Sequence, residues 1–108
     1  MSKKLEFIVI LPDKEGSLER RMKVRPDHLS AVSKQVEAGF WTFGGALLED
    51  HPKEGESPKI NGSIMLASAD SKEEVIETLK NDTYYQNEVW DWEKVKVYPF
   101  KTAVRKAL

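Results

Sequence analysis

The sequence predicts an α+β fold in which four antiparallel strands carry two helices on one face, in the order β-α-β-β-α-β. Segments rich in β-branched and aromatic residues alternate with segments whose apolar residues recur at helical spacing. Polar stretches with proline and glycine separate several of these segments. The chain of 108 residues is long enough to bury one core, so we expect a single domain over residues 1–108.

The first two expected elements are a strand and a helix. The segment KLEFIVILP predicts a strand over 5–11 that ends at Pro12, and its nearly continuous apolar run indicates cover on both faces. The helix is expected to begin near Pro26, which suits a first turn, with Asp27 at the positive end of the helix dipole. Gly39 ends this helix, and its apolar face consists of Leu29, Val32 and Val36.

The middle of the chain predicts two strands joined by a long loop. The segment FWTFGGALL, over 40–48, has strand character, and its paired Gly44 and Gly45 indicate a bulge or a close approach of another group to the backbone. The polar stretch over 49–62 predicts an exposed loop. A third strand is expected in GSIMLASAD, over 62–70.

A second helix and a fourth strand complete the order. Ser71 and Glu74 have the spacing of a capping box, and the following apolar face consists of Val75, Ile76 and Leu79. The segment EVWDWEKVKVYPF alternates imperfectly between apolar and polar residues and predicts a strand from 88 or 89 to 98. The basic tail KTAVRKAL is expected to form a frayed turn.

This order is that of the ferredoxin-like fold, which leaves one face of the sheet open. We expect that face to carry the Trp and Phe side chains of FWTF and VWDW, a larger apolar area than small monomers expose. Packing of two copies, sheet against sheet, would cover it. The sequence therefore predicts a homodimer.

Composition and motifs exclude several partners and chemistries. The 17 Lys and Arg and the 18 Asp and Glu are interspersed, so there is no basic patch for nucleic acid or a membrane surface. Cysteine is absent, and we find no phosphate-binding loop, hydrolase motif or metal-ligand cluster, so neither a metal nor a cofactor is expected. The N-terminal apolar run is too short for a signal peptide or a membrane span, which predicts a cytoplasmic location.

The two histidines and one aspartate are the candidates for chemistry. His51 precedes Pro52 in the polar loop, where a solvated position is expected. His28 falls in the first turn of the expected helix, either as a half-buried structural side chain or as a proton carrier. Asp82 opposes the dipole at the end of the second helix, so it either caps the turn or serves another purpose. Antiparallel helices would bring His28 and Asp82 together.

The chain resembles the YCII-related family over nearly its whole length. The resemblance is carried by GSLERRMKVRPDHL, GFWTFGGAL, NGSIMLASADSKEEV, LKNDTYY and VKVYPF. The most specific of these, RPDHL, is close to the family's Arg-Pro-x-His-Leu signature. The resemblance implies the dimeric α/β-barrel version of the ferredoxin-like fold and a catalytic pair formed by His28 and Asp82. The family usually has Asp-Pro-Tyr, whereas this chain has Asp82-Thr83-Tyr84. Without the proline the backbone after Asp82 is freer, so the direction of the Asp82 carboxylate is less fixed.

Further residues are expected to form a pocket beside this pair. Arg21 and Arg25 match basic positions of the family and either bind an anionic substrate or form surface ion pairs. The aromatic residues of the expected pocket are also explained as ordinary core, and the glycines would open space for a ligand. These residues are Trp41, Phe43, Gly44, Gly45 and Tyr84.

A histidine held by a carboxylate is fixed in one tautomer and is a better base, able to move a proton next to a carbonyl or phenolic hydroxyl. We therefore expect a lyase- or isomerase-like enzyme that acts on a small cyclic, aromatic or carbonyl-bearing substrate, as the resemblance also implies. The alternative is a non-catalytic homodimeric module that binds a small ligand or is purely structural. Cofactor-free monooxygenase chemistry, as in other dimeric α/β barrels, is a third interpretation with less support from the residues.

Overall fold

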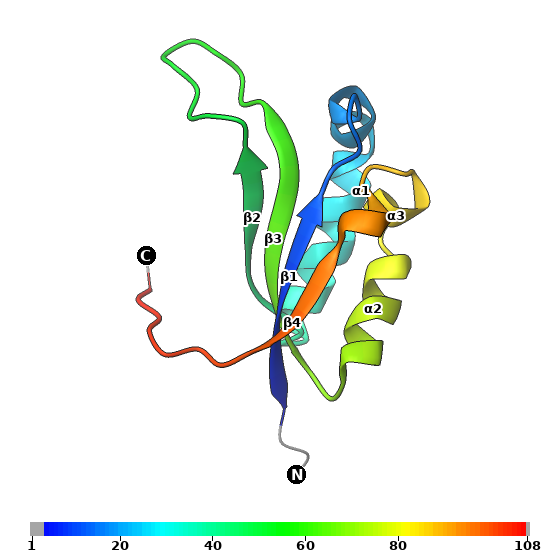
Figure 1. The fold of residues 1–108 in the computed structure, drawn as a ribbon, viewed down its shortest axis with the longest axis vertical. Coiled ribbons are helices and arrows are strands. Elements are labelled where there is room, and N and C mark those ends of the chain that lie inside the picture. The colour runs from blue at the N-terminus through cyan, green and yellow to red at the C-terminus, as the bar shows by residue number, and fades with distance from the viewer. Residues whose placement is uncertain (1–3, 108) are drawn as a thin grey trace.

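The computed structural model describes residues 4–107 and has the expected order of elements (Figure 1). Four antiparallel strands form one sheet in the order β2-β3-β1-β4. They are β1 (Leu5–Pro12), β2 (Trp41–Leu48), β3 (Ile60–Ala69) and β4 (Lys96–Phe100). The helices lie on one face of this sheet, as Figure 1 shows, and are α1 (Leu18–Glu37), α2 (Lys72–Lys80) and the short α3 (Thr83–Gln86). This is the ferredoxin-like fold.

The core lies between the helices and one face of the sheet. Cross-strand register places Trp41, Ala67 and Phe7 in one row on this face, and all three are buried. Val75 and Leu79 of α2 are completely buried against it. The predicted apolar face of α2 is therefore confirmed for these two residues, whereas Ile76 is only half-buried. The predicted cap is present as well, because the Glu74 backbone N–H donates to Ser71 Oγ at 3.2 Å.

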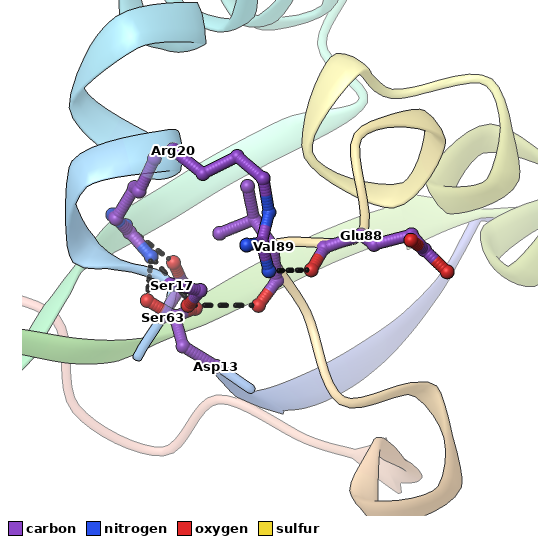
Figure 2. A network of polar contacts seen from close by, with 7 residues as sticks. Asp13, Ser17, Arg20, Ser63, Glu88 and Val89 are labelled. Atoms are coloured by element: carbon purple, nitrogen blue, oxygen red, sulfur yellow. Dashed lines mark hydrogen bonds and ion pairs between the residues drawn. The ribbon is translucent and has the colours of Figure 1, made fainter. Parts of the chain in front are cut away.

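Helix α1 begins at Leu18, so the expected start near Pro26 was wrong. The first turns are fixed by contacts with a distant segment: Ser17 Oγ donates to the Val89 carbonyl at 3.3 Å, and Arg20 Nη2 donates to the Glu88 carbonyl at 2.8 Å (Figure 2). Pro26 is accommodated inside the helix, and Asp27 is not at the dipole end. The start of α1 depends on these long-range bonds, for which the local sequence has no signal.

Of the residues predicted to form the apolar face of α1, only some pack against the core. Val32 packs against the core, but Leu29 is 44% exposed and Val36 is 53% exposed. His28, by contrast, is 8% exposed. The apolar stripe of α1 therefore forms a wall beside the core, and His28 lies deeper than its apolar neighbours.

The first three strands agree with the predictions, with three differences in detail. Strand β3 begins at Ile60, so Ile60 and Asn61, which we expected in the loop, belong to the strand. Ile8 and Ile10 are half-buried, so β1 is only partly covered on its second face. The register of β2 shifts between Trp41 and Phe43 and again between Leu47 and Leu48, so the irregularities lie on either side of the paired glycines and not at them. The polar connection before Ile60 contains no regular secondary structure and projects beyond the sheet in Figure 1.

Strand β4 begins at Lys96, so the expected start at 88 or 89 was wrong. Residues 89–91 instead pair with the end of β1: the Lys14 N–H donates to the Val89 carbonyl at 2.8 Å, and the Asp91 N–H donates to the Pro12 carbonyl at 2.8 Å. A turn of 3-10 helix, Trp92–Lys94, then leads into the strand. The apolar and polar residues of this segment alternate imperfectly because a 3-10 turn separates the residues that pair with the end of β1 from strand β4.

The open face of the sheet does not carry the tryptophans that we expected there. Trp41 and Trp90 are buried in the core, and Trp92 packs edge-on against Tyr85. Cross-strand register instead places one apolar row on this face, made of Phe43, Leu66, Ile8 and Tyr98. Its ends are exposed, Phe43 by 62% and Tyr98 by 48%. None of the helices in residues 4–107 has the length and apolar character needed to cross a membrane.

Candidate functional site

His28 and Asp82 form a buried pair between α1 and the end of α2. Nδ1 of His28 lies 2.7 Å from Oδ1 of Asp82, and the two side chains are 10% and 9% exposed. The same oxygen accepts the Tyr84 backbone N–H at 2.8 Å and caps α3. Asp82 therefore combines the two roles that the sequence left open, since it caps a turn and also contacts His28.

The contacts of His28 fix the orientation of its ring. Because a carboxylate only accepts, the neutral imidazole carries its proton on Nδ1 and keeps a lone pair on Nε2. The ring stacks on Tyr84 with centroids 3.7 Å apart and planes 8° apart, and it packs perpendicular to the Trp90 ring with centroids 6.3 Å apart. His28 is thus held in one tautomer and one position.

A cavity of about 440 Å³ lies beside this pair, between α1 and the β2–β3 hairpin. One wall comes from a single face of α1, where the cavity residues are Arg21, Arg25, His28, Leu29, Val32 and Val36. The facing wall comes from β2 and β3 and includes Trp41, Gly44, Gly45, Ser63 and Met65. Phe43 also borders the cavity, although cross-strand register places its side chain on the open face of the sheet. Tyr84 also lines it. The cavity is therefore mostly apolar, with an imidazole and two guanidinium groups on one side.

Arg21 is a buried cation that is held in a fixed network. Its Nη1 donates to both carboxylate oxygens of Asp13 at 2.9 Å, and its Nη2 donates to Ser63 Oγ at 2.9 Å. Figure 2 places Asp13 and Ser63 together below the start of α1. Burial raises the pKa of the Asp13 carboxyl, and the charge of Arg21 opposes this effect. The network fixes the guanidinium at the cavity wall.

Arg25 differs from Arg21 although both line the cavity. Its side chain is exposed, and within residues 4–107 it forms neither an ion pair nor a side-chain hydrogen bond. Its charge is therefore available to a ligand. Of the two arginines that the sequence singled out, Arg21 is engaged by protein groups and Arg25 is not.

The structure brings the expected site residues together, with Asp82 behind His28 and the others on the cavity surface. A Cβ added to Gly44 would lie 3.5 Å from the Ile64 carbonyl, an ordinary contact, so the backbone alone does not demand glycine there. His51 is exposed in the loop, as predicted. Among residues 4–107, no three His, Asp or Glu side chains are grouped so as to hold a metal ion.

Sequence reasoning missed Asp13 and Ser63. Asp13 follows β1 and has a side chain that is 4% exposed, and Ser63 is a buried hydroxyl within an apolar strand. The sequence contains no clear signal for either residue, because the strand around Ser63 also contains Asn61 and Ser68 and because their partner Arg21 lies on a different element. Their role became evident only from the contacts.

Comparison with known proteins agrees with this architecture. The family model of the YCII-related domain matches residues 5–101. The chain belongs to the YCII-related family. Fusaric acid biosynthesis protein 2 of Gibberella fujikuroi is a similar member, 34% identical over 97 residues that make up 90% of this chain and 93% of that protein.

Other matches differ in length or in sequence. Aspartate kinase FUB3 of Fusarium oxysporum f. sp. lycopersici is 35% identical over 98 residues, and the match spans 91% of this chain but 18% of that protein. The solved structure of 5-chloro-2-hydroxyhydroquinone dehydrochlorinase (TftG) from Burkholderia phenoliruptrix AC1100, in complex with 2,5-dihydroxybenzoquinone, is 22% identical. It matches with a TM-score of 0.78 over 90% of this chain and 94% of that chain, so the two share a fold.

Proposed function

We propose that this member of the YCII-related family is a small-molecule enzyme in which His28 transfers a proton and Asp82 orients its ring. One observation carries the proposal: the imidazole of His28 binds a buried carboxylate through Nδ1 and at the same time borders a cavity of about 440 Å³. A general base needs a fixed tautomer, a free lone pair and access to its substrate. The surroundings of His28 favour all three.

We propose a small planar anion as the substrate, such as an ionised phenol, quinone or enol. The guanidinium of Arg25 supplies a free positive charge, and the apolar cavity wall suits the faces of a ring. The dehydrochlorinase that shares this fold has a hydroxylated quinone as its ligand. These observations favour the class of substrate and leave its substituents open.

The proposed step is proton transfer next to a carbonyl or from a phenolic hydroxyl. Nε2 takes the proton, the electron pair of the broken bond moves toward oxygen, and the resulting negative charge faces the arginines. The imidazolium, stabilised by Asp82, then returns the proton to another atom in an isomerisation or to a leaving group in an elimination. No group outside the chain is needed for this exchange.

Deuterium exchange tests the proposal without knowledge of the natural substrate. The probe is 2,5-dihydroxybenzoquinone in D₂O, with its ring C–H signal followed by NMR. A ring carbon of the ionised quinone first takes a deuteron from the His28 imidazolium and becomes saturated, and neutral His28 then removes the proton from that carbon, so that its electron pair returns to the conjugated oxygen. We expect the wild-type protein to accelerate exchange, His28→Gln to lose about 100-fold or more of that acceleration, and His51→Gln to retain it. Exchange by His28→Gln at the wild-type rate would refute the role of His28.

The structural alternative is favoured by a specific observation, namely that Asp82 caps α3 and His28 is largely enclosed. In that case the pair would only join two helices of a non-catalytic binding module. His28→Gln would then lower the free energy of unfolding, and the wild-type protein would not accelerate exchange above the rate in buffer. Measurement of both quantities on the same samples separates the two functions.

We also propose that two copies pack sheet against sheet. The support is the apolar row on the open face, whose ends Phe43 and Tyr98 are largely exposed. Light scattering coupled to size-exclusion chromatography tests this proposal. The wild-type mass should be twice that of the 12.4 kDa chain, and Tyr98→Lys should shift the protein toward the monomer.

A further inference from the structure

Tyr84 is 1% exposed, yet it lines the cavity. One ring contact is the parallel stack on His28, at 3.7 Å between centroids. The guanidinium carbon of Arg21 lies 4.7 Å from the Tyr84 centroid, and the Trp90 ring packs perpendicular to Tyr84 with centroids 5.8 Å apart. These contacts fix the position of the phenol ring, so its hydroxyl also has a fixed position beside the imidazole.

The Tyr84 hydroxyl has no protein partner among residues 4–107. The hydrogen bonds of Tyr84 in that part of the chain involve its backbone alone: its N–H donates to Asp82, and its carbonyl accepts from Val89. Two side-chain polar atoms in that part of the chain are sealed from solvent without a partner, Arg21 Nε and the Trp90 indole nitrogen. The Tyr84 hydroxyl is not one of them, so it is not sealed. Since Tyr84 is among the residues that line the cavity, we take the cavity to be the space that its unpaired O–H faces.

Burial keeps the Tyr84 hydroxyl protonated at neutral pH. Burial raises the pKa of the Tyr84 phenol above its ordinary value of 10.0. Arg21 and Arg25 act in the opposite direction, and Asp82 and Asp13 raise it further. Tyr84 is therefore available as a hydrogen-bond donor, and an oxygen that carries negative charge is its best acceptor.

We propose that Tyr84 is a second catalytic residue, whose hydroxyl donates a hydrogen bond to the substrate oxygen that becomes negative when His28 removes a proton. This inference rests on the proposed function. In the step, the C–H bond breaks, the proton goes to Nε2, and the electron pair moves through the conjugated system to the oxygen that faces Tyr84. When the proton returns, the same electrons re-form the C–H bond and the oxygen loses its charge.

The decisive variant is Tyr84→Phe, which removes the hydroxyl and keeps the ring that stacks on His28. The matched control is Tyr85→Phe, because the half-buried Tyr85 packs 4.8 Å from Trp92 and does not line the cavity. We expect Tyr84→Phe to bind 2,5-dihydroxybenzoquinone at least about tenfold more weakly, as for loss of a hydrogen bond to a charged group. Its deuterium exchange should fall further than its affinity, while Tyr85→Phe should match the wild-type protein in both.

A merely structural role for Tyr84 has a different signature. It would lower the thermal midpoint of Tyr84→Phe and leave exchange by the folded variant intact, which would overturn the inference. As a second measurement, the Cζ ¹³C signal of Tyr84 should shift when the quinone is added to wild-type protein. Absence of this shift in a sample that binds the quinone would also overturn it.

Comparison of His28→Gln, Tyr84→Phe and the wild-type protein distinguishes the role of Tyr84 from the proposed function. If His28→Gln abolishes exchange and Tyr84→Phe does not, the proposed function stands and the role of Tyr84 is refuted. If Tyr84→Phe abolishes exchange and His28→Gln does not, the role of Tyr84 is supported and that of His28 is refuted. If the wild-type protein neither binds the quinone nor exchanges its protons, both are refuted.

Discussion

Asp82 and His28 are 54 residues apart in the sequence, yet Oδ1 of one lies 2.7 Å from Nδ1 of the other. The same oxygen also accepts the backbone N–H of Tyr84, the second residue of α3. Orientation of the imidazole and initiation of a helix thus depend on one atom. Substitutions at and beside Asp82 can separate these two roles.

Asp82→Asn should affect the site more than the fold. Asparagine caps helices about as well as aspartate, so we expect the free energy of unfolding to change by less than about 1 kcal/mol. Without the carboxylate charge, the Nδ1–H tautomer and the imidazolium of His28 are no longer favoured, and proton exchange should fall by about 10²–10⁴. Imidazole ¹⁵N shifts report the tautomer, and Asp91→Asn is the control. Unchanged ¹⁵N shifts would contradict the orienting role of Asp82.

Thr83→Pro should stabilise the protein by about 0.4–1 kcal/mol, because proline restricts the unfolded chain at a position that already suits it. Thr83 is the first residue of α3, where no helical N–H bond is lost, and Asp82 has φ −77° and ψ 144°, as a residue before proline requires. Urea unfolding measures the change. Thr78→Pro, inside α2, should instead cost about 3 kcal/mol. A destabilised Thr83→Pro would mean that Asp82 is not held as described.

Asp13→Asn should be strongly destabilising. It leaves the Arg21 guanidinium buried without its counter-charge, which typically costs about 3–5 kcal/mol. The control is Glu88→Gln, which breaks the exposed pair with Lys14 at 3.4 Å and should cost less than about 1 kcal/mol. Urea unfolding of both variants at neutral pH checks the prediction. An equal decrease in the free energy of unfolding of the two variants would show that the buried pair of Asp13 and Arg21 stabilises the protein no more than the exposed pair does.

The contact between β1 and the C-terminal tail should be lost in acid. The Thr102 hydroxyl and backbone N–H both donate to the Glu6 carboxylate, and these bonds lower the pKa of Glu6 below its ordinary 4.5. A lowered pKa means that the contact contributes fully above pH 4.5 and is lost as the pH falls through the folded-state value. The Thr102 amide signal should therefore move only below that pH. Glu6→Gln should abolish this titration.

The chain order and most strands could be predicted because their signals are local. Apolar runs, Pro12 and the capping box at Ser71 mark elements within a few residues. The start of α1 could not be predicted, because bonds from Ser17 and Arg20 to residues 87–89 hold it in place. The start of β4 was missed for a similar reason, since residues 89–91 pair with the end of β1.

In the candidate site, too, some features could be predicted from the sequence and others could not. The contact between His28 and Asp82 followed from the order of the elements, although His28 lies within α1 and not at its start. Asp13 and Ser63 had no comparable signal, because a single polar residue beside a strand has many possible partners. Their function depends on Arg21, which joins β1, α1 and β3.

The wall that α1 forms beside the cavity has a consequence for ligand size. Arg25 and Arg21 lie three and seven residues before His28 on one rigid helix, so their Cα atoms are set back about 4.5 Å and 10.5 Å along its axis. The Arg21 guanidinium nevertheless extends back over the Tyr84 ring, 4.7 Å from its centroid, and the same ring stacks on His28 at 3.7 Å. The imidazole and this guanidinium are therefore separated by no more than the span of one aromatic ring and its neighbours, and a compound with one ring is long enough to face both.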